Sequence, residues 1–557
     1  MAPTAKGAPI SSATRIREFF AGSTKPRSAA SAKRLTLVAT ILGSSIALLD
    51  VSVVSVALPS IQRSLGGGLA GEQWVSNAYL LTLGSLILLG GSLADIFGER
   101  RIFGIGVAGF GVASLLCAIA PTIGLLIAFR ALQGIAGALL TPSSLALIVA
   151  TFPGQERGPA IGTWTAWGTI ASALGPLVGG GLLSVVSWRW IFLINTPLVL
   201  GCLWLIVTAV PAGNRPATRQ KVDVIGAALC GLGLGGTVYA LIEEPRLGWS
   251  NFAVMASLIA GVVLFASFLV YEAHASHPML RLDLFKRRNF AVGNVETFLL
   301  YGGLSALFFF LMLYLQQVAG YTPLQSGLAL LPESAVMFLL SSRFGALADR
   351  YGPRFFMGVG PLVAGSGLLL LMTVGVQVTY ATQVLPGLLL FSLGLAMTVA
   401  PLTAAILAGV DEQEAGIASG VNNAVARVAG LIATVALGAL VAAQVSSSLD
   451  SELAGKPLTT RGRAAVTQAK HLTLGRPPVA GIPPTEAAEI VRASNQSSLD
   501  GFRLGVSIAG FLVIAGGVIG GLGIRNPRRV VNAADCRGGQ LAGAPLDAAG
   551  LHATGTA

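Results

Sequence analysis

The stretch LTLVATILGSSIALLDVSVVSVALPSI, residues 35–61, decides the fold. It is apolar over more than the roughly 20 residues that an α-helix needs to cross a bilayer, and it is far too long for a strand of a membrane β-barrel. One carboxylate, Asp50, interrupts it. A charge at the centre of a membrane helix costs about 2.5 to 3.5 kcal/mol, so a chain that keeps one commonly uses it for ions, protons or substrate. The structural alternative is an Asp held by a neighbouring helix for packing alone.

The composition extends this reading to the whole chain. Of its 557 residues 54% are hydrophobic and only 11% are charged, with a mean hydropathy of +0.75. A soluble globule of this size needs more polar surface. The chain is therefore expected to be an all-α polytopic membrane protein embedded in the lipid bilayer, with fourteen spans at about 35–61, 74–94, 102–120, 122–150, 159–184, 188–210, 222–242, 251–272, 289–317, 323–345, 354–376, 380–408, 414–444 and 501–523.

The distribution of Lys and Arg predicts the orientation. Residues 1–34 form a basic tail without an apolar core of a signal peptide, so we expect them in the cytoplasm. The short outer loops then carry only Arg63, Arg189 and Arg246, as the positive-inside rule requires. This predicts a multi-pass protein of the plasma (inner) membrane with both termini cytoplasmic. The net charge of +12 then reflects topology and lipid contact, and no nucleic-acid partner is expected.

Several classes of chemistry have no sequence support. There is no GxxxxGK[ST] phosphate-binding loop, so ATP is not expected to supply the energy within this chain. The four His lack metal-ligand spacing, and the four Cys suggest no disulfide framework. We therefore expect no cofactor, no metal and no enzymatic activity, and a monomer.

An internal repeat divides the chain. GSLADIFGERR (91–101) and GALADRYGPRF (345–355) share one pattern and each follows an apolar run. Asp95 and Asp349 are 349 − 95 = 254 residues apart, about two helices more than a six-helix half requires. The predicted layout is a tail 1–34, a six-helix half 35–210, two inserted helices with linkers 211–288, a second six-helix half 289–523 that includes an outer loop 446–500, and a tail 524–557. Within that loop, RGRAAVTQAKHL and PTEAAEIVRAS are expected to form a helical hairpin.

Both copies of the repeat lie on predicted cytoplasmic loops, where they can form a latch. Asp95 can accept hydrogen bonds from helix N-terminal amides and pair with Arg100 or Arg101. Such a latch can hold one conformation and release in another. The alternative is a static contact that only fixes the loop. The candidate latch residues are Gly91, Asp95, Gly98, Arg100, Arg101, Asp349 and Arg350.

This motif resembles the cytoplasmic loop signature of the major facilitator superfamily, and fourteen spans resemble its drug:proton antiporter branch (EmrB/QacA-like). The chain departs from the family pattern at Ile96 and Glu99. The resemblance implies a major facilitator fold of two six-helix halves plus two inserted central helices.

Five further motifs are similar to elements of this branch. LLDVSVVSVALPSI (48–61) resembles the first-helix motif with Asp50 at its acidic position, and WRWIFLINTP (188–197) resembles a signature of the fourteen-span branch. The resemblance also assigns the fourth-helix motif to Arg130, Gln133 and Gly134, the antiporter motif of the fifth helix to Gly175, Pro176, Gly179 and Gly180, and the thirteenth-span motif to Asn423 and Arg427.

Depth along the helices suggests how the buried charges combine. Asp50 and Arg130 both fall in the outer half of the bilayer, so we expect them to pair directly or through Gln133 or water. Two more acids are candidates for proton coupling or substrate binding. Glu296 lies on the counterpart of the first helix, although it can equally be an inner-end residue near the cytoplasm. Glu333 can equally pair with Arg427.

The function that these features predict is proton-coupled export of amphipathic, cationic small molecules such as antibiotics. Its partners are then the small-molecule drug substrate and protons. An alternative is a dedicated exporter of one self-made antibiotic or siderophore. A non-transporting membrane sensor is a third reading, against which the paired latch motifs and the buried charges argue.

Overall fold

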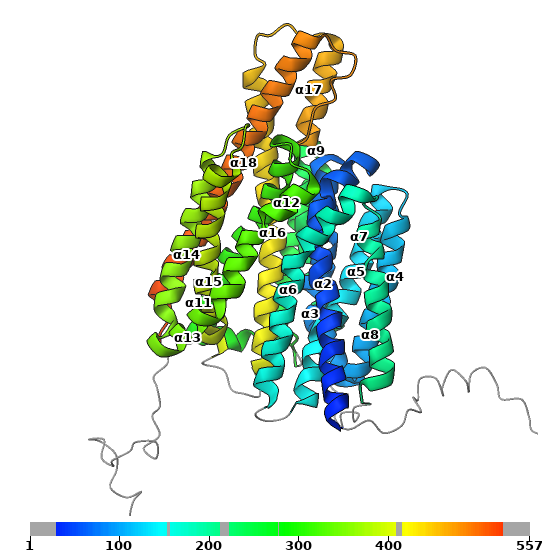
Figure 1. The fold of residues 1–557 in the computed structure, drawn as a ribbon, viewed down its shortest axis with the longest axis vertical. Helices are drawn as coiled ribbons and strands as arrows, with labels where there is room; N and C mark the ends of the chain where they lie inside the picture. Colours follow the sequence, from blue (N-terminus) through cyan, green and yellow to red (C-terminus); the bar gives the residue numbers. More distant parts are fainter. Residues whose placement is uncertain (1–28, 153–155, 212–221, 277, 408–414, 527–557) are drawn as a thin grey trace, which may run out of the picture.

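The computed structural model describes residues 29–152, 156–211, 222–276, 278–407 and 415–526. Within them, fourteen helices are long and apolar enough to cross a membrane, which confirms the predicted number of spans. Most of the predicted tails, residues 1–28 and 527–557, lies outside the described residues. The helices stand side by side in one tall bundle (Figure 1).

The first half of the chain packs as an N-terminal bundle in which α3 packs against α5, α4 against α5, and α2 against α6. The expected span 188–210 is broken at Ile194, between two helices of different length. The helices of this bundle are α2 (Ala29–Leu65), α3 (Gly68–Phe97), α4 (Glu99–Ile119), α5 (Ile123–Thr151), α6 (Arg157–Val185), α7 (Trp190–Leu193) and α8 (Asn195–Ala209).

The second half forms a C-terminal bundle in which α14 packs against α15 and α18, and α11 packs against α16 and α18. The expected span 323–345 is two helices, because the chain turns at Leu330 just before Pro332, which has no backbone N–H to donate. The main helices are α11 (Arg288–Leu313), α12 (Pro323–Ala329), α13 (Leu331–Tyr351), α14 (Pro353–Leu370), α15 (Leu385–Leu407), α16 (Ala415–Glu452) and α18 (Pro484–Gly523). A π-helical turn, Tyr314–Val318, continues α11.

Two additional helices lie between the bundles. α9 (Val224–Leu247) and α10 (Phe252–His274) pack on each other, and α9 also contacts α3 of the first bundle and α16 of the second. The inserted pair therefore covers a seam where the two halves meet.

A helical hairpin projects beyond the bundle (Figure 1). It contains α17 (Thr460–Leu472), as expected from RGRAAVTQAKHL. PTEAAEIVRAS forms the start of α18, which supplies the other helix of the expected hairpin and runs without a break into the last span. The end of α17 and the link after it touch both halves. The backbone of His471 lies against Gly68, and Nε of Arg476 donates to the carbonyl of Gln317 at 3.3 Å.

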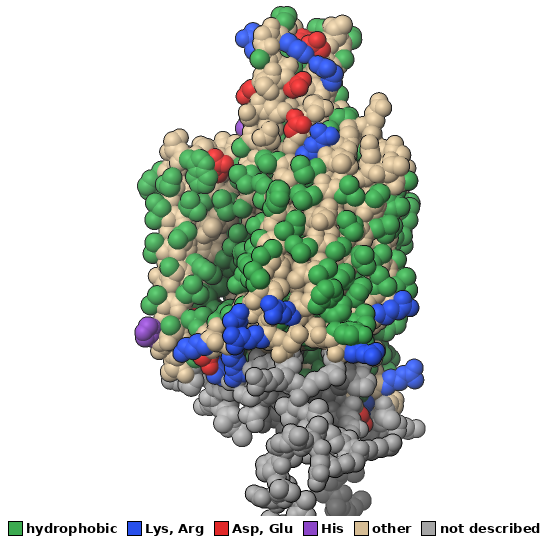
Figure 2. All heavy atoms as spheres, turned by 90° about the vertical axis from the view of Figure 1, so that its left-hand side faces the viewer, with side chains coloured by type: hydrophobic (Ala, Val, Ile, Leu, Met, Phe, Trp, Pro, Cys, Tyr) green, Lys and Arg blue, Asp and Glu red, His purple; other side chains and the backbone are tan. Residues whose placement is uncertain are grey.

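The two ends of the bundle differ in charge. Both ends of the described chain lie opposite the hairpin (Figure 1), and Lys and Arg side chains gather near that end on the face shown in Figure 2. Hydrophobic side chains cover much of the same face between this region and the hairpin. We call the two ends the basic end and the hairpin end. The apolar band between them is the part that a bilayer would surround.

Candidate transport site

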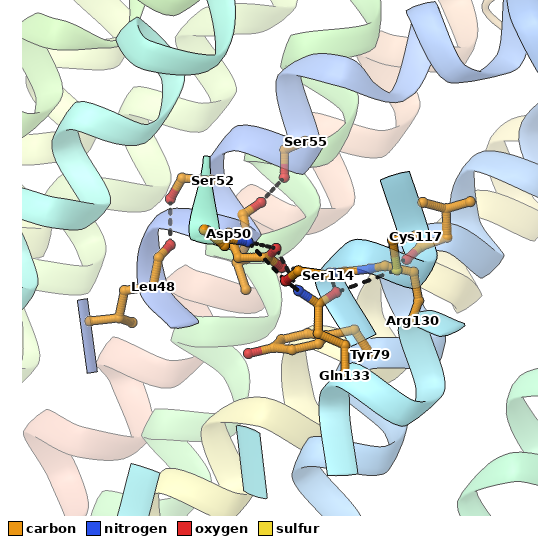
Figure 3. A network of polar contacts seen from close by, with 12 residues as sticks. Leu48, Asp50, Ser52, Ser55, Tyr79, Ser114, Cys117, Arg130 and Gln133 are labelled. Carbon is orange, nitrogen blue, oxygen red and sulfur yellow. Dashed lines mark hydrogen bonds and ion pairs between the residues drawn. The ribbon is translucent and has the colours of Figure 1, made fainter. Parts of the chain in front are cut away.

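The structure brings Asp50 and Arg130 together in the N-terminal bundle (Figure 3). Nη1 of Arg130 donates to Oδ2 of Asp50 at 2.5 Å, and the two side chains are only 0% and 1% exposed. α2 supplies the acid and α5 supplies the base. Removing either partner would leave the other charge buried without compensation, which is costly in a medium of low dielectric constant.

The second carboxylate oxygen of Asp50 is also occupied. Nε2 of Gln133 donates to Oδ1 at 2.9 Å and Nδ2 of Asn195 donates to the same atom at 3.0 Å. Both amides also lie within hydrogen-bond distance of the Ser114 hydroxyl, at 2.9 and 3.2 Å. Side chains from α4, α5 and α8 thus surround a carboxylate on α2. Together with Arg130, these amides provide a hydrogen-bond donor to each carboxylate oxygen of Asp50.

Arg130 is fixed from several directions. Nε donates to the carbonyl of Val75 at 3.1 Å, and Nη1 also donates to Oε1 of Gln133 at 2.7 Å. The guanidinium lies over the ring of Tyr79, 4.5 Å from its centroid (Figure 3). α3 and α5 can approach this closely because Gly134 has no side chain. A Cβ there would lie between Thr82 and the Tyr79 carbonyl.

Sequence reasoning missed Asn195 and Ser114. Asn195 is fully buried and belongs to the WRWIFLINTP stretch. An Asn in an otherwise apolar span was the available signal, because buried amides require hydrogen-bond partners. Ser114 gave no signal, since a single hydroxyl in a helix can bond to its own backbone.

Glu296 was a candidate for proton coupling or substrate binding, with an inner-end residue near the cytoplasm as the alternative, and its side chain packs inside the C-terminal bundle. It is 0% exposed, and neither carboxylate oxygen has a hydrogen-bond partner among the described residues. A Cβ on Gly520 of α18 would overlap its Oε2. Depth along a helix could be read from the sequence, but the direction of the side chain could not.

Glu333 and Arg427 do not pair in this structure. Glu333 is half-buried, and its Oε2 accepts a hydrogen bond from Ser334 at 3.1 Å. Among the described residues no ion pair joins Glu333 to Arg427. Arg427 lies on α16 beside Gly84 of α3. Glu333 lies on α13 and Arg427 lies on α16, and the described residues show no contact between the two side chains.

The glycines of the antiporter motif are points of close helix contact. Gly175 and Gly179 face Ser52 and Val53 of α2, so they bring α6 against the helix that carries Asp50. Gly180 faces α12 of the other half, where a Cβ would lie 2.6 Å from the carbonyl oxygen of Pro323.

Gly327 of α12 completes this contact, because a Cβ there would overlap the carbonyl of Pro176. The halves also touch nearby, where Nε2 of Gln316 donates to the carbonyl of Val56 at 2.9 Å. The motif therefore lies at a backbone-to-backbone seal between the halves. Gly327 was not among the predicted site residues, although a glycine in the short segment before Pro332 indicates close helix packing.

The latch is not engaged in this structure. Asp95 is exposed and, within the described part of the chain, forms no ion pair with Arg100 or Arg101. Arg100 donates to the carbonyl of Val207 at 3.2 Å instead. Gly98 has a φ of 91°, which favours glycine, and Gly91 lies near Pro142.

The second copy of the latch is seen less completely. The side chain of Asp349 lies outside the described residues, although its backbone belongs to α13. The Arg350 guanidinium is 5.5 Å from the ring centroid of Tyr351.

The described residues contain no group of three or more His, Cys, Asp or Glu side chains that could hold a metal.

Comparison with known proteins places this geometry in a family. Residues 40–434 match the family model of the Major Facilitator Superfamily. The chain is 32% identical to the "Tetracenomycin C resistance and export protein" of Streptomyces glaucescens, over 87% of this chain and 90% of that protein. It is 38% identical to the "Puromycin resistance protein pur8" of Streptomyces alboniger, over 73% and 82%. It is also 36% identical to the "Multidrug resistance protein Stp" of Mycobacterium tuberculosis, over 75% and 78%.

Solved structures agree on the fold. A bacterial homologue of the human lysosomal transporter Spinster, in an inward-facing and unoccupied conformation, superposes with a TM-score of 0.59 at 16% identity. The superposition covers 91% of this chain and all of that one. The chain therefore belongs to the major facilitator superfamily, in its branch of antibiotic and multidrug exporters.

Proposed function

We propose that this protein exports amphipathic small molecules, including antibiotics, across the plasma membrane in exchange for protons. The observation that carries the proposal is the fully buried pair of Asp50 and Arg130, with Gln133 and Asn195 on the remaining carboxylate oxygen. A chain that only needed packing at this position would be served by apolar side chains at lower cost. A titratable carboxylate is the group that a proton-driven carrier requires.

Coupling follows from the two protonation states of Asp50. The ionised carboxylate binds Arg130 and holds α2 and α5 in the observed arrangement. Protonation removes the negative charge and leaves the Arg130 guanidinium without its counterion, so a different packing of these helices becomes favourable. Protons and substrate then drive transport if they stabilise opposite conformers.

The conformation seen here fits the state that is open toward the cytoplasm. The halves seal against each other near the hairpin end through Gly180 and Gly327, and the latch residue Asp95 forms no ion pair with any described residue. Opening the other side would separate α6 from α12 and allow the latch to form. In this orientation the basic end, with both ends of the described chain, faces the cytoplasm, in agreement with the positive-inside rule.

For the substrate, we propose an amphipathic molecule that can carry a cationic group. Of the three acids Asp50, Glu296 and Glu333, the last is available to it, because Asp50 is compensated by Arg130 and Glu296 packs against α18. The names of the relatives point to two antibiotics as first probes, tetracenomycin C and puromycin. A dedicated exporter of one compound is the second candidate, which the name of the tetracenomycin relative favours.

The test is proton release from proteoliposomes when each antibiotic is added under a pH gradient. Wild-type protein should respond to at least one of them, and Asp50→Asn should lose the response while it still inserts into the vesicles. Glu489→Gln, which changes an exposed acid in the hairpin, serves as the matched control and should respond like wild type. Gradient-driven transport by Asp50→Asn at the wild-type rate would refute the proposal. A response to only one antibiotic would favour the dedicated exporter.

A further inference from the structure

Arg427 is a charged residue in the middle of the bundle that the proton-coupling network does not use. It lies beside Gly84, close to the midpoint of α3, where a Cβ on Gly84 would be 3.5 Å from the Cβ of Arg427. α16 and α3 come from different halves of the chain. Arg427 is thus at the junction of the two bundles, at the depth where a charge is most costly in a membrane protein.

The guanidinium of Arg427 lacks a counterion. Within the described residues it has no ion pair and no hydrogen bond. The side chain is half-buried, so the helices do not enclose it completely. Arg130, which carries the same charge in the N-terminal bundle, has three polar partners, and this contrast makes the missing counterion of Arg427 informative.

The neighbours of Arg427 are neutral hydrogen-bonding groups. Asn423 lies one helical turn away on the same face of α16 and is exposed. The hydroxyl of Thr297 on α11 donates to Oδ1 of Asn422 at 2.8 Å. The polar side chains next to Arg427 on α16 and on the adjoining α11 are therefore amides and a hydroxyl, and the described residues provide no carboxylate partner.

We propose that Arg427, with Asn423 beside it, binds an acidic group of the transported molecule, such as a carboxylate or an ionised phenol. A guanidinium forms charge-assisted, often bidentate hydrogen bonds with such groups, and amide N–H groups add further donors. This inference rests on the proposed export function and names a second recognition point for its substrate. Glu333, on α13, would recognise a cationic group, so the carrier accepts amphipathic acids and zwitterions as well as cations.

The experiment uses two aromatic probes of equal size and opposite charge, anthraquinone-2-carboxylate and 2-(aminomethyl)anthraquinone. Their equilibrium binding to the full-length protein in lipid nanodiscs is measured at neutral pH, with empty nanodiscs subtracted. Arg427→Gln should weaken binding of the carboxylate by at least about tenfold, the loss expected for a charge-assisted hydrogen bond. It should change binding of the amine by less than about twofold, whereas Glu333→Gln should weaken the amine selectively.

Two further variants keep the test decisive if Arg427→Gln does not fold. Arg427→Lys retains the charge and should bind the carboxylate within about threefold of wild type. Asn423→Asp places a carboxylate one turn from Arg427, so it should compensate the guanidinium and weaken the carboxylate probe without removing the arginine. Arg63→Gln is the charge-matched control, since Arg63 is exposed at the hairpin end.

The outcomes separate this inference from the proposed function. If Asp50→Asn binds the carboxylate normally but loses proton-coupled transport, both proposals stand. Wild-type protein that binds the amine but not the carboxylate, or carboxylate binding that is equal in wild type, Arg427→Gln and Asn423→Asp, would overturn the role of Arg427 and leave the export function untouched.

Discussion

The two halves of this transporter repeat one architecture but treat buried charge differently. In the N-terminal bundle Asp50 on the first helix is bound by Arg130, Gln133 and Asn195. In the C-terminal bundle Glu296 lies on the counterpart helix and points toward α18, but its oxygens have no hydrogen-bond partner in the described part of the chain. Duplication has preserved the helices and the latch motif, whereas the polar network belongs to one half only. Fold symmetry therefore does not imply that both halves bind protons in the same way.

The largest effect should come from breaking the N-terminal pair. Arg130→Leu leaves the Asp50 carboxylate buried without its cation, and we expect a loss of about 3 to 5 kcal/mol in the free energy of unfolding. Titration with a denaturing detergent measures it. The double variant Asp50→Asn/Arg130→Leu should recover much of that loss, because no charge is left. Purely additive losses would show that the pair is not coupled.

A smaller loss should follow when one amide is removed from the network. Asn195→Ala takes one donor from Oδ1 of Asp50, and hydrogen bonds to charged groups are worth about 1.5 to 3 kcal/mol. The same unfolding titration reports the change. In the background of Asp50→Leu the substitution should cost clearly less, since the carboxylate it served is gone. An unchanged cost there would assign the role of Asn195 to packing.

The stability of the C-terminal half should depend on side-chain volume around Glu296 and not on the charge of Glu296. Gly520→Ala places a methyl group where Oε2 of Glu296 lies, and overpacking of this kind costs about 1 to 3 kcal/mol. Shortening the acid in Gly520→Ala/Glu296→Ala should restore much of the stability. If the double variant is less stable than either single variant, the two side chains are not in contact.

The smallest effect is expected for Glu296→Gln. No hydrogen bond from another described residue reaches either oxygen, so an amide of the same shape should change the unfolding free energy by less than about 1 kcal/mol. Asp50→Asn, measured alongside, should cost more. A loss at Glu296 as large as that at Asp50 would reveal a partner for the acid and restore the symmetry between the halves.

The sequence was sufficient for those features that depend on hydropathy and depth. Fourteen apolar runs predicted fourteen spans, and the positions of Asp50 and Arg130 along oppositely running helices predicted their contact. The direction of Glu296 was not accessible, because depth along a helix does not specify which neighbour a side chain faces. The continuity of α18 was accessible in principle, since no Gly or Pro interrupts the chain between Pro484 and Gly501.

The contact of α6 with α12 has a mechanical consequence. Its closest atoms belong to the main chain around Gly180 and Gly327. Main-chain atoms have no rotamers, so this junction cannot yield by the gradual reorientation of side chains around a passing molecule. The junction is therefore either packed or separated, and the change between these two states must move whole helices as rigid bodies. Leakage of protons or solutes then depends on how often α6 and α12 separate, and a single added methyl group would keep them apart.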